Sequence, residues 1–267
     1  MGADTKKIRN RIKSVSSTKQ LTKAMGLVAS SKIRRATDAM MKSRGYEKAV
    51  TEIIKSVTAS PECQKSPYMR NSEKKKIKFI VVAGDRGMAG GYNANIFRTV
   101  NEYENAEIIP VGARACDRYG AERNSSEDFS SLDASKLAKT LCEEFAKGEF
   151  DALGIVCTRY VSILTQEAYV KWVLPLTKSE GSANTSVIFE PNEAEILEYA
   201  VREYVAGAIM NAVREGFACE VAARRNAMDS AGKNAQTMID ELTLSYNRAR
   251  QGAITQEITE IVAGSGL

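Results

Sequence analysis

The chain has 267 residues, of which 43% are hydrophobic, and a formal net charge of +5. It contains no histidine, which excludes Ser-His-Asp and Cys-His nucleophile systems, and no apolar run approaches the ~20 residues of a membrane span. Its five cysteines are scattered and none forms a C-x-x-C pair, so we expect reduced thiols rather than a zinc site or a redox motif.

The first 60 residues predict one long basic helix. They carry 14 Lys and Arg against 4 Asp and Glu, and they contain no proline. Apolar residues recur mostly at spacings of three, four or seven, which is typical of one buried helix face; they are Ile8, Ile12, Val15, Leu21, Met25, Val28, Ala36 and Met40. A continuous helix over residues 5–57 would be about 80 Å long, too long to lie on a small globule. The N-terminus lacks the apolar core of a secretory signal, so we expect the protein to stay in the cytosol.

The charge of this helix raises the question of its partner. Between Lys6 and Arg44, twelve basic residues accompany one acid, Asp38. Nucleic acid, a membrane surface or an acidic protein could each bind such a helix. Residues 6–44 contain no Phe, Tyr or Trp that could stack on bases or anchor in lipid headgroups. We therefore favour an acidic protein partner and expect no nucleic acid.

The middle of the chain, residues 61–191, contains all five prolines and alternates between strand and helix patterns. Strands are predicted at 76–84, 107–112, about 150–158, about 167–176 and 185–191, helices at 93–105, 114–120 and 130–148, and loops at 120–133 and 179–186. This alternation predicts an α/β fold with a small, mostly parallel sheet flanked by helices.

A glycine-rich loop follows the first predicted strand, in the sequence FIVVAGDRGMAGGYN with glycines at 84, 87, 90 and 91. A strand, such a loop and a helix are the usual elements of a phosphate site. The spacing G-x-x-G-x-x-G-G, however, matches neither the dinucleotide fingerprint nor the P-loop, which also requires a lysine. We therefore expect these glycines to supply positive φ angles and close packing. Asp85 and Arg86 could pair with each other or with a partner.

Residues 192–267 predict a second long helix, with 7 basic against 11 acidic residues. A three-four alternation indicates a coiled-coil seam, formed by Ala227 or Met228, Ala231, Ala235, Met238, Leu242, Ser245 or Tyr246, Ala249 and Ala253. Its alanines would let a partner helix approach closely, which suits antiparallel pairing with the N-terminal helix. Counted from Pro191, this helix could reach about 100 Å. The predicted domains are thus two coiled-coil helices, 1–60 and 192–267, and a central α/β domain, 61–191.

Three segments resemble blocks of one protein family, the γ subunits of F-type ATP synthases. They are LTKAMGLVASSKIRRA (21–36), DRGMAGGYN (85–93) and SYNRARQGAITQEITEIVAG (245–264), and the resemblance spans the chain. It implies a long antiparallel coiled coil of the N- and C-terminal helices beside a central Rossmann-like α/β domain. It also implies that this domain binds no nucleotide, so that no cofactor and no small-molecule ligand is expected.

The same resemblance implies a function and a set of partners. A γ subunit is a non-catalytic rotor shaft that couples ion flow through the membrane rotor to conformational cycling of the catalytic β subunits. One copy lies inside a hexamer of α and β subunits, and its lower end contacts the ε subunit and the membrane c-ring. The absence of a chloroplast-type cysteine insert argues against a plastid, and the absence of a transit peptide favours a bacterium, so we expect a peripheral place on the cytoplasmic face of a bacterial cell membrane.

Individual contacts are carried over from the family by position. Residues that match its contacts between shaft and catalytic hexamer are Lys23, Met25, Arg224, Arg250, Gln251, Thr255 and Glu257. Phe189 and Glu190 match the segment nearest the rotor ring. The stretch 252–267 carries only two charges and is expected to turn in an apolar sleeve. Gly26 stands where the family commonly has Glu or Lys, in mid-helix, where glycine costs ~1 kcal/mol relative to alanine.

Two other functions remain as alternatives. A nucleotide-dependent α/β enzyme would require a phosphate-binding fingerprint, and it gives no reason for two long terminal helices. A nucleic-acid-binding protein with a basic helical arm would require aromatic side chains in that arm, and it leaves the segment 245–264 unexplained.

Overall fold

The computed structural model describes residues 3–70, 75–177, 190 and 192–266, and it divides into two compact units. The coiled-coil unit comprises the chain up to Ser30 and from Arg224 onward. The α/β unit comprises Ser31–Ala223. Two long helices contribute to both units, whereas the boundaries predicted at residues 60 and 191 follow the ends of these helices. That three-part division stays a prediction.

The two long helices are α1 (Ala3–Thr58) and α5 (Glu193–Gly264), of 56 and 72 residues. Neither contains proline, whose ring would break the backbone hydrogen-bond ladder, so each can continue without interruption. Both helices were predicted from the sequence, and they are confirmed.

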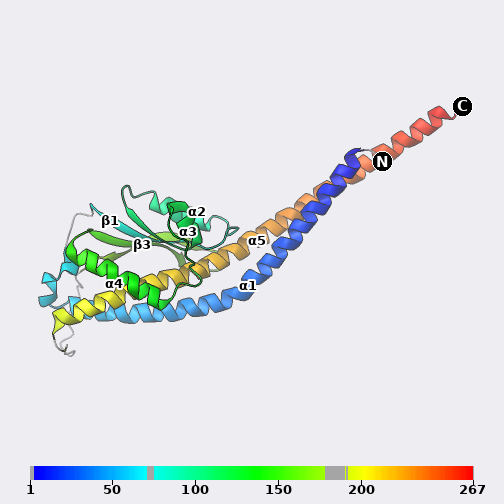
Figure 1. The fold of residues 1–267 in the computed structure, drawn as a ribbon. Coiled ribbons are helices and arrows are strands. Elements are labelled where there is room, and N and C mark those ends of the chain that lie inside the picture. The colour runs from blue at the N-terminus through cyan, green and yellow to red at the C-terminus, as the bar shows by residue number, and fades with distance from the viewer. Residues whose placement is uncertain (1–2, 71–74, 178–189, 191, 267) are drawn as a thin grey trace. The chain divides into compact units, whose positions relative to one another are not determined.

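In the coiled-coil unit, α1 and α5 lie side by side (Figure 1). Lys19 donates a hydrogen bond to Gln236, and a Cβ placed on Gly26 would lie 3.6 Å from Cβ of Met228. Residue numbers thus rise along one helix while they fall along the other. The pairing is antiparallel, as the sequence predicted.

The seam of this unit repeats every seven residues on both helices. On α1 its positions are Thr5, Ile8, Ile12, Val15, Lys19, Thr22, Gly26 and Ala29, and on α5 they are Met228, Gly232, Ala235, Ile239, Leu242, Tyr246, Ala249 and Ala253. All of these residues are buried or half-buried. Strict seven-residue spacing is the mark of a coiled coil.

Three residues were wrongly assigned from the sequence, Leu21 and Val28 to the buried face of the N-terminal helix and Met238 to the seam of the C-terminal helix. Leu21, Val28 and Met238 are 61%, 57% and 43% exposed, respectively. Each lies one position before a seam residue, and successive residues of a helix are turned by about 100°. Their side chains therefore point away from the partner helix, although their hydrophobicity favoured the seam.

The α/β unit contains one four-stranded sheet in the order β2-β1-β3-β4. Its strands are β1 (Ile77–Val82), β2 (Glu107–Val111), β3 (Ala152–Tyr160) and β4 (Gln166–Leu174). β1 is parallel to β2 and β3, and β3 and β4 form an antiparallel hairpin. The predicted α/β class and mostly parallel sheet are confirmed, while the strand predicted at 185–191 and the loop at 179–186 lie outside the described residues, apart from Glu190.

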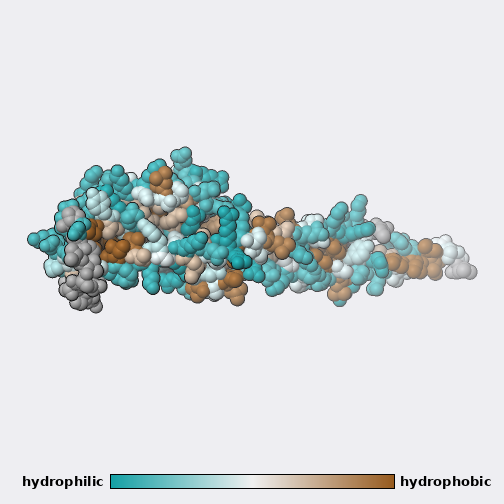
Figure 2. Space-filling view, turned by 90° about the horizontal axis from the view of Figure 1, so that it is seen from below, coloured by the Kyte–Doolittle hydropathy of each residue, from teal (hydrophilic) through white to brown (hydrophobic). Residues whose placement is uncertain are grey.

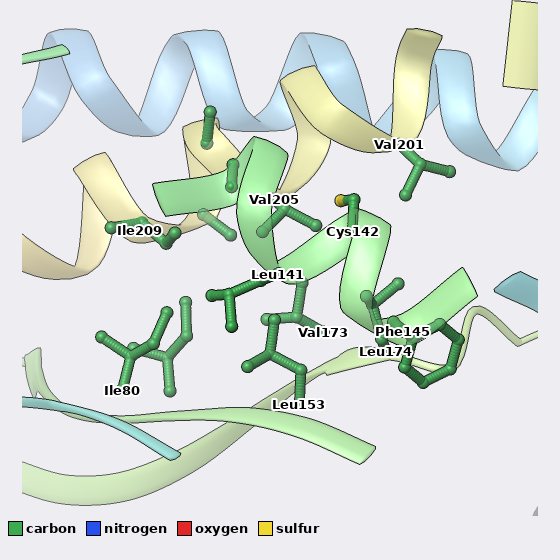
Figure 3. Close-up of a cluster of buried hydrophobic side chains, with 14 of the residues drawn as sticks. Ile80, Leu141, Cys142, Phe145, Leu153, Val173, Leu174, Val201, Val205 and Ile209 are labelled. Atoms are coloured by element: carbon green, nitrogen blue, oxygen red, sulfur yellow. The ribbon is translucent and has the colours of Figure 1, made fainter. Parts of the chain in front are cut away.

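Helices cover both faces of the sheet. On one face, α4 (Ser131–Lys147) and α5 enclose a core with the strands, in which Leu141, Phe145 and Ile209 are fully buried (Figure 3). On the other face, α2 (Tyr92–Val100) packs on Phe79 and Val156. The short helix α3 (Ala113–Tyr119) follows β2, and two 3-10 turns (Glu62–Lys65 and Pro67–Met69) follow α1.

The start of α4 illustrates how local sequence sets a boundary. The hydroxyl of Ser130 accepts a hydrogen bond from the N–H of Asp133, and the Asp133 carboxylate accepts one from the N–H of Ser130. This reciprocal arrangement satisfies helix donors that otherwise lack partners. The capping residues seen in the sequence therefore predicted the helix start correctly.

A polar layer lies between α1, α5 and the edge of the sheet in the α/β unit. Glu215 of α5 is buried and accepts hydrogen bonds from the Arg44 guanidinium, at 2.6 Å, and from the N–H of Tyr160, at 2.7 Å. Glu47 of α1 is paired with Lys171 of β4 and accepts a hydrogen bond from Asn211. Two acids and two bases are thus balanced within an otherwise apolar interior.

Candidate functional site

The glycine-rich loop at residues 84–91 is the first candidate site, because its backbone could hold a phosphate. The N–H of Asp85 points to Oε2 of Glu220 at 3.4 Å, and the N–H of Arg86 points to Oε1 at 3.2 Å. Glu220 lies on α5 and is 1% exposed. A carboxylate of the protein itself thus occupies the position that a phosphate would take in a nucleotide-binding loop.

In this loop, two of the glycines leave room for a neighbouring side chain, and only one adopts a positive φ angle. Of the four, only Gly90 has a positive φ, and a second positive φ is adopted by Met88. A Cβ on Gly84 would lie 2.6 Å from Cδ of Glu220, and one on Gly87 would lie 2.9 Å from the Arg114 guanidinium. The expectation of positive φ at all four glycines is therefore wrong, whereas the close packing expected with it is found at Gly84 and Gly87.

The sequence did not identify a partner for Asp85, and in the structure this residue connects three parts of the α/β unit. Its carboxylate accepts hydrogen bonds from the N–H groups of Ala113, Ser126 and Glu127 and from the hydroxyl of Ser125. Burial alone would raise the pKa of Asp85, but these hydrogen bonds outweigh it and hold the pKa below its ordinary value. Asp85 is therefore a structural acceptor.

The second candidate site is the outer surface of the coiled-coil unit, which carries all seven residues carried over for contact with the catalytic hexamer. Lys23 is exposed and Met25 half-buried on α1, and Arg224 is half-buried on α5. The remaining four, Arg250, Gln251, Thr255 and Glu257, are exposed near the end of α5. The structure brings the seven onto one unit, in two groups that are far apart along α5.

The end of α5 extends past its partner helix. The pairs 19/236 and 26/228 place the start of α1 opposite about residue 251, since an antiparallel partner advances one residue for each residue of α1. We call residues 251–266 the tip. Ile254, Ile258, Ile261 and Val262 of the tip are 46–70% exposed, and the space-filling view shows apolar side chains toward the end of the coiled-coil unit (Figure 2).

Sequence reasoning missed a second set of exposed apolar residues on this unit. Leu27 and Val28 are consecutive on α1, Leu21 lies about two turns before them, and all three are more than half exposed. A hydrophobic residue off the heptad positions was the signal that could have identified them.

The two residues carried over for the rotor ring are Phe189 and Glu190, of which the structure describes only Glu190. Phe189 lies outside the described residues, and Glu190 is exposed. Among residues 3–70, 75–177, 190 and 192–266, no helix is long and apolar enough to cross a membrane. Within the same ranges, no cluster of three or more His, Cys, Asp or Glu side chains could hold a metal ion.

Solved structures define the class of this fold. It is similar to the rotor of the Euglena gracilis mitochondrial ATP synthase, with a TM-score of 0.66 at 18% identity over 95% of this chain and 100% of that one. It is also similar to the central stalk of the Tetrahymena thermophila mitochondrial ATP synthase, with a TM-score of 0.60 at 19% identity over 79% and 99%. The fold is that of ATP synthase rotor stalks.

Sequence comparison identifies the family. Residues 4–266 match the family described as ATP synthase. The chain is 36% identical to the sodium ion specific ATP synthase gamma chain of Acetobacterium woodii, over 99% of both chains, and 37% identical to the ATP synthase gamma chain of Desulforamulus reducens, over 98% of both. The chain belongs to the γ subunits of F-type ATP synthases. The resemblance seen in the sequence is thus confirmed, while the contact residues carried over from it stay predictions.

Proposed function

We propose that this chain is the central rotor shaft of an F-type ATP synthase, which couples ion flow through the membrane rotor to conformational cycling of the catalytic β subunits. The observation that carries this proposal is the tip, where a single helix exposes Ile254, Ile258 and Ile261. A helix of about four turns without packing is marginally stable in water. Such a helix needs a surrounding apolar surface, which a ring of α and β subunits would supply.

The shaft would act by linkage. A rod that contacts the open and closed forms of a β subunit differently must shift the nucleotide affinity of that subunit, at about 1.4 kcal/mol per tenfold change. Nucleotide binding then acts back on the rod by the same free energy. When the three β subunits change state one after another, these free-energy differences would turn the rod.

We propose a partner for each unit of the chain from the side chains on its surface and from its family. The exposed basic residues of α1 suit acidic loops of the β subunits, and this attraction would be screened over about 8–10 Å by physiological salt. The ε subunit and the membrane c-ring would bind the α/β unit, with one copy of the chain in each complex. We place the complex on the cytoplasmic face of a bacterial cell membrane, because the curated relatives named above are bacterial gamma chains.

We also propose that the chain itself is not catalytic. The feature most suggestive of an enzyme is the glycine-rich loop, and two of its N–H groups donate to Glu220. An incoming phosphate would have to displace a buried carboxylate of the protein. A titration of the isolated chain with ATP is expected to show no saturable binding.

The experiment that tests the shaft function is reconstitution. Purified α and β subunits are mixed with and without this chain, and the mixture is examined by gel filtration and by steady ATP hydrolysis. We expect one copy of the chain to join the hexamer and to raise steady turnover by about tenfold, the equivalent of ~1.4 kcal/mol. A chain that neither joins the hexamer nor changes turnover contradicts the proposal.

The carried-over residues are tested in the same assay. Arg250→Ala and Gln251→Ala are expected to lower turnover of the assembled complex by about tenfold each, because each removes a polar contact with the catalytic subunits. Arg248→Ala is the matched control, since Arg248 is an exposed arginine two residues before Arg250 on the same helix. Equal effects at Arg248 and Arg250 would contradict the carried-over assignment.

A further inference from the structure

One turn of α5 lies unusually close to the loop between β1 and α2. A Cβ on Gly216 would lie 3.2 Å from both the Tyr92 hydroxyl and Cγ1 of Val82, and the Tyr92 hydroxyl donates to the carbonyl of Gly216 at 2.9 Å. Four residues further along α5, the Glu220 side chain fills the space beside Gly84. Two glycines, one on each side, thus allow α5 and this loop to meet almost backbone to backbone.

Glu220 is the charged group of this contact. Its two carboxylate oxygens receive the consecutive N–H groups of Asp85 and Arg86. Consecutive backbone N–H groups form a concave site for an anion. Burying a carboxylate is unfavourable unless it is held by such donors, and Glu220 is 1% exposed with these two N–H groups directed at it.

We propose that Glu220 is a positioning residue that anchors the shaft helix α5 to the α/β domain, so that a turning force on one is carried to the other. This inference rests on the proposed function of the chain as a rotor shaft. Apolar packing around Phe79 and Cys219 is non-directional and tolerates a small rotation of the helix. Hydrogen bonds lose strength steeply when their angle changes, so the Glu220 contact resists that rotation.

The anchor continues from the loop to the other long helix. The side chain of Asp85 binds the turn at residues 125–127, as described above. In that turn, Glu127 forms an ion pair of 2.7 Å with Lys32 of α1, and Arg214 of α5 donates to the carbonyl of Phe129 at 3.3 Å. Both long helices are therefore connected to the domain through one set of polar contacts centred on the glycine loop.

The test uses the complete ion-translocating complex with Glu220→Gln in this chain. The amide keeps the size of the side chain but removes its charge and places an NH₂ group against a backbone N–H. We expect ATP hydrolysis without an ion gradient to stay within about twofold of wild type. Ions transported per ATP against an opposing gradient should fall by about threefold or more, within the range seen when coupling residues are altered.

A matched control and a conservative variant accompany this change. Glu198→Gln removes an exposed carboxylate from the same helix, one paired with Arg202 at 3.2 Å, and it should leave the transport ratio unchanged. Glu220→Asp keeps the charge on a shorter side chain and should give an intermediate ratio. Amide exchange of residues 85–86 in the isolated chain should quicken by about tenfold in Glu220→Gln and less in Glu220→Asp, since these N–H groups lose their acceptor.

Three results would overturn the anchor. An unchanged transport ratio in Glu220→Gln is the first, and unchanged amide exchange at residues 85–86 is the second. The third is a parallel loss of assembly, hydrolysis and transport in both Glu220 variants, which would assign the residue to folding alone. Failure of the shaft function would give a different result. The wild-type chain would then not restore transport at all, whereas amide exchange in the isolated chain would still respond to Glu220→Gln.

Discussion

Two glycines of this chain, Gly26 and Gly112, differ in whether their surroundings have room for a Cβ atom. Gly26 lies in the middle of α1, where a Cβ would be in ordinary contact with Met228 at 3.6 Å. Gly112 precedes α3 with a φ of +97°, and a Cβ there would lie 2.1 Å from the carbonyl oxygen of Ala83. The same substitution should therefore stabilise the protein at one position and destabilise it at the other.

For Gly26→Ala we expect the free energy of unfolding to rise by about 1 kcal/mol, since alanine is the better helix former and the space is available. For Gly112→Ala we expect it to fall by about 3 kcal/mol, because the new methyl group meets backbone in a conformation that favours glycine. Urea unfolding followed by circular dichroism measures both. A destabilised Gly26→Ala would mean that the seam needs glycine for close approach of the helices.

Asp85 gives the protein a dependence on pH. Its folded pKa lies below the ordinary value of about 3.9, so its carboxylate stabilises the folded state above about pH 4, and this contribution is lost as the pH falls through the folded pKa. We expect Asp85→Asn to cost about 2 kcal/mol near pH 7 and less near pH 3. Urea unfolding at several pH values measures the difference. Asp128→Asn, at an exposed position just after the turn that Asp85 binds, should show a much smaller change. A pH-independent cost of Asp85→Asn would contradict the argument.

At the scale of elements, the polar layer determines how α1, α5 and the sheet edge fit together. Arg44 and Tyr160 both hold the buried carboxylate of Glu215. Removing one partner leaves a buried charge partly uncompensated, which costs more than the pair itself contributes. Arg44 is partly exposed, so solvent screens part of this effect.

We expect Arg44→Met to lower the free energy of unfolding by about 2 kcal/mol, and the double change Arg44→Met with Glu215→Gln to recover part of that loss. Thermal and urea unfolding of the isolated chain measure both variants. Arg34→Met, on an exposed face of the same helix, is the matched control and should be close to neutral. Additive effects of the two substitutions would show that Arg44 and Glu215 do not interact.

Elements whose sequence follows local rules could be predicted, whereas contacts between distant parts of the chain could not. The four described strands and the capping box of α4 follow local rules, and each was predicted within a few residues. The coiled-coil seam was harder to predict, because Lys19, Thr22 and Gly26 occupy its heptad positions while Leu21 and Val28 lie outside them. Hydrophobicity alone misplaces a seam when large apolar side chains lie outside the heptad positions. Glu220 was not predicted as a loop partner, since 135 residues separate it from Asp85.

At the scale of the whole molecule, the tip should behave differently from the paired part of α5. In the isolated chain we expect amides of residues 254–264 to exchange at least about a hundredfold faster than those of residues 228–242, because a single unpacked helix frays. In the assembled complex the tip should gain protection. Hydrogen exchange with mass spectrometry measures both states, and a tip already protected in the isolated chain would contradict its need for a surrounding partner.

The seven-residue repeat of the coiled-coil unit has a consequence for its mechanics. A straight helix drifts by about 20° per heptad from such a repeat, so two helices that keep it must wind around each other in a left-handed sense. The pair is therefore chiral, like a two-ply cord. A twist in the direction of the winding draws the small seam residues together, and a twist in the other direction separates them. We expect a shaft built in this way to respond differently to large twists in the two directions of rotation.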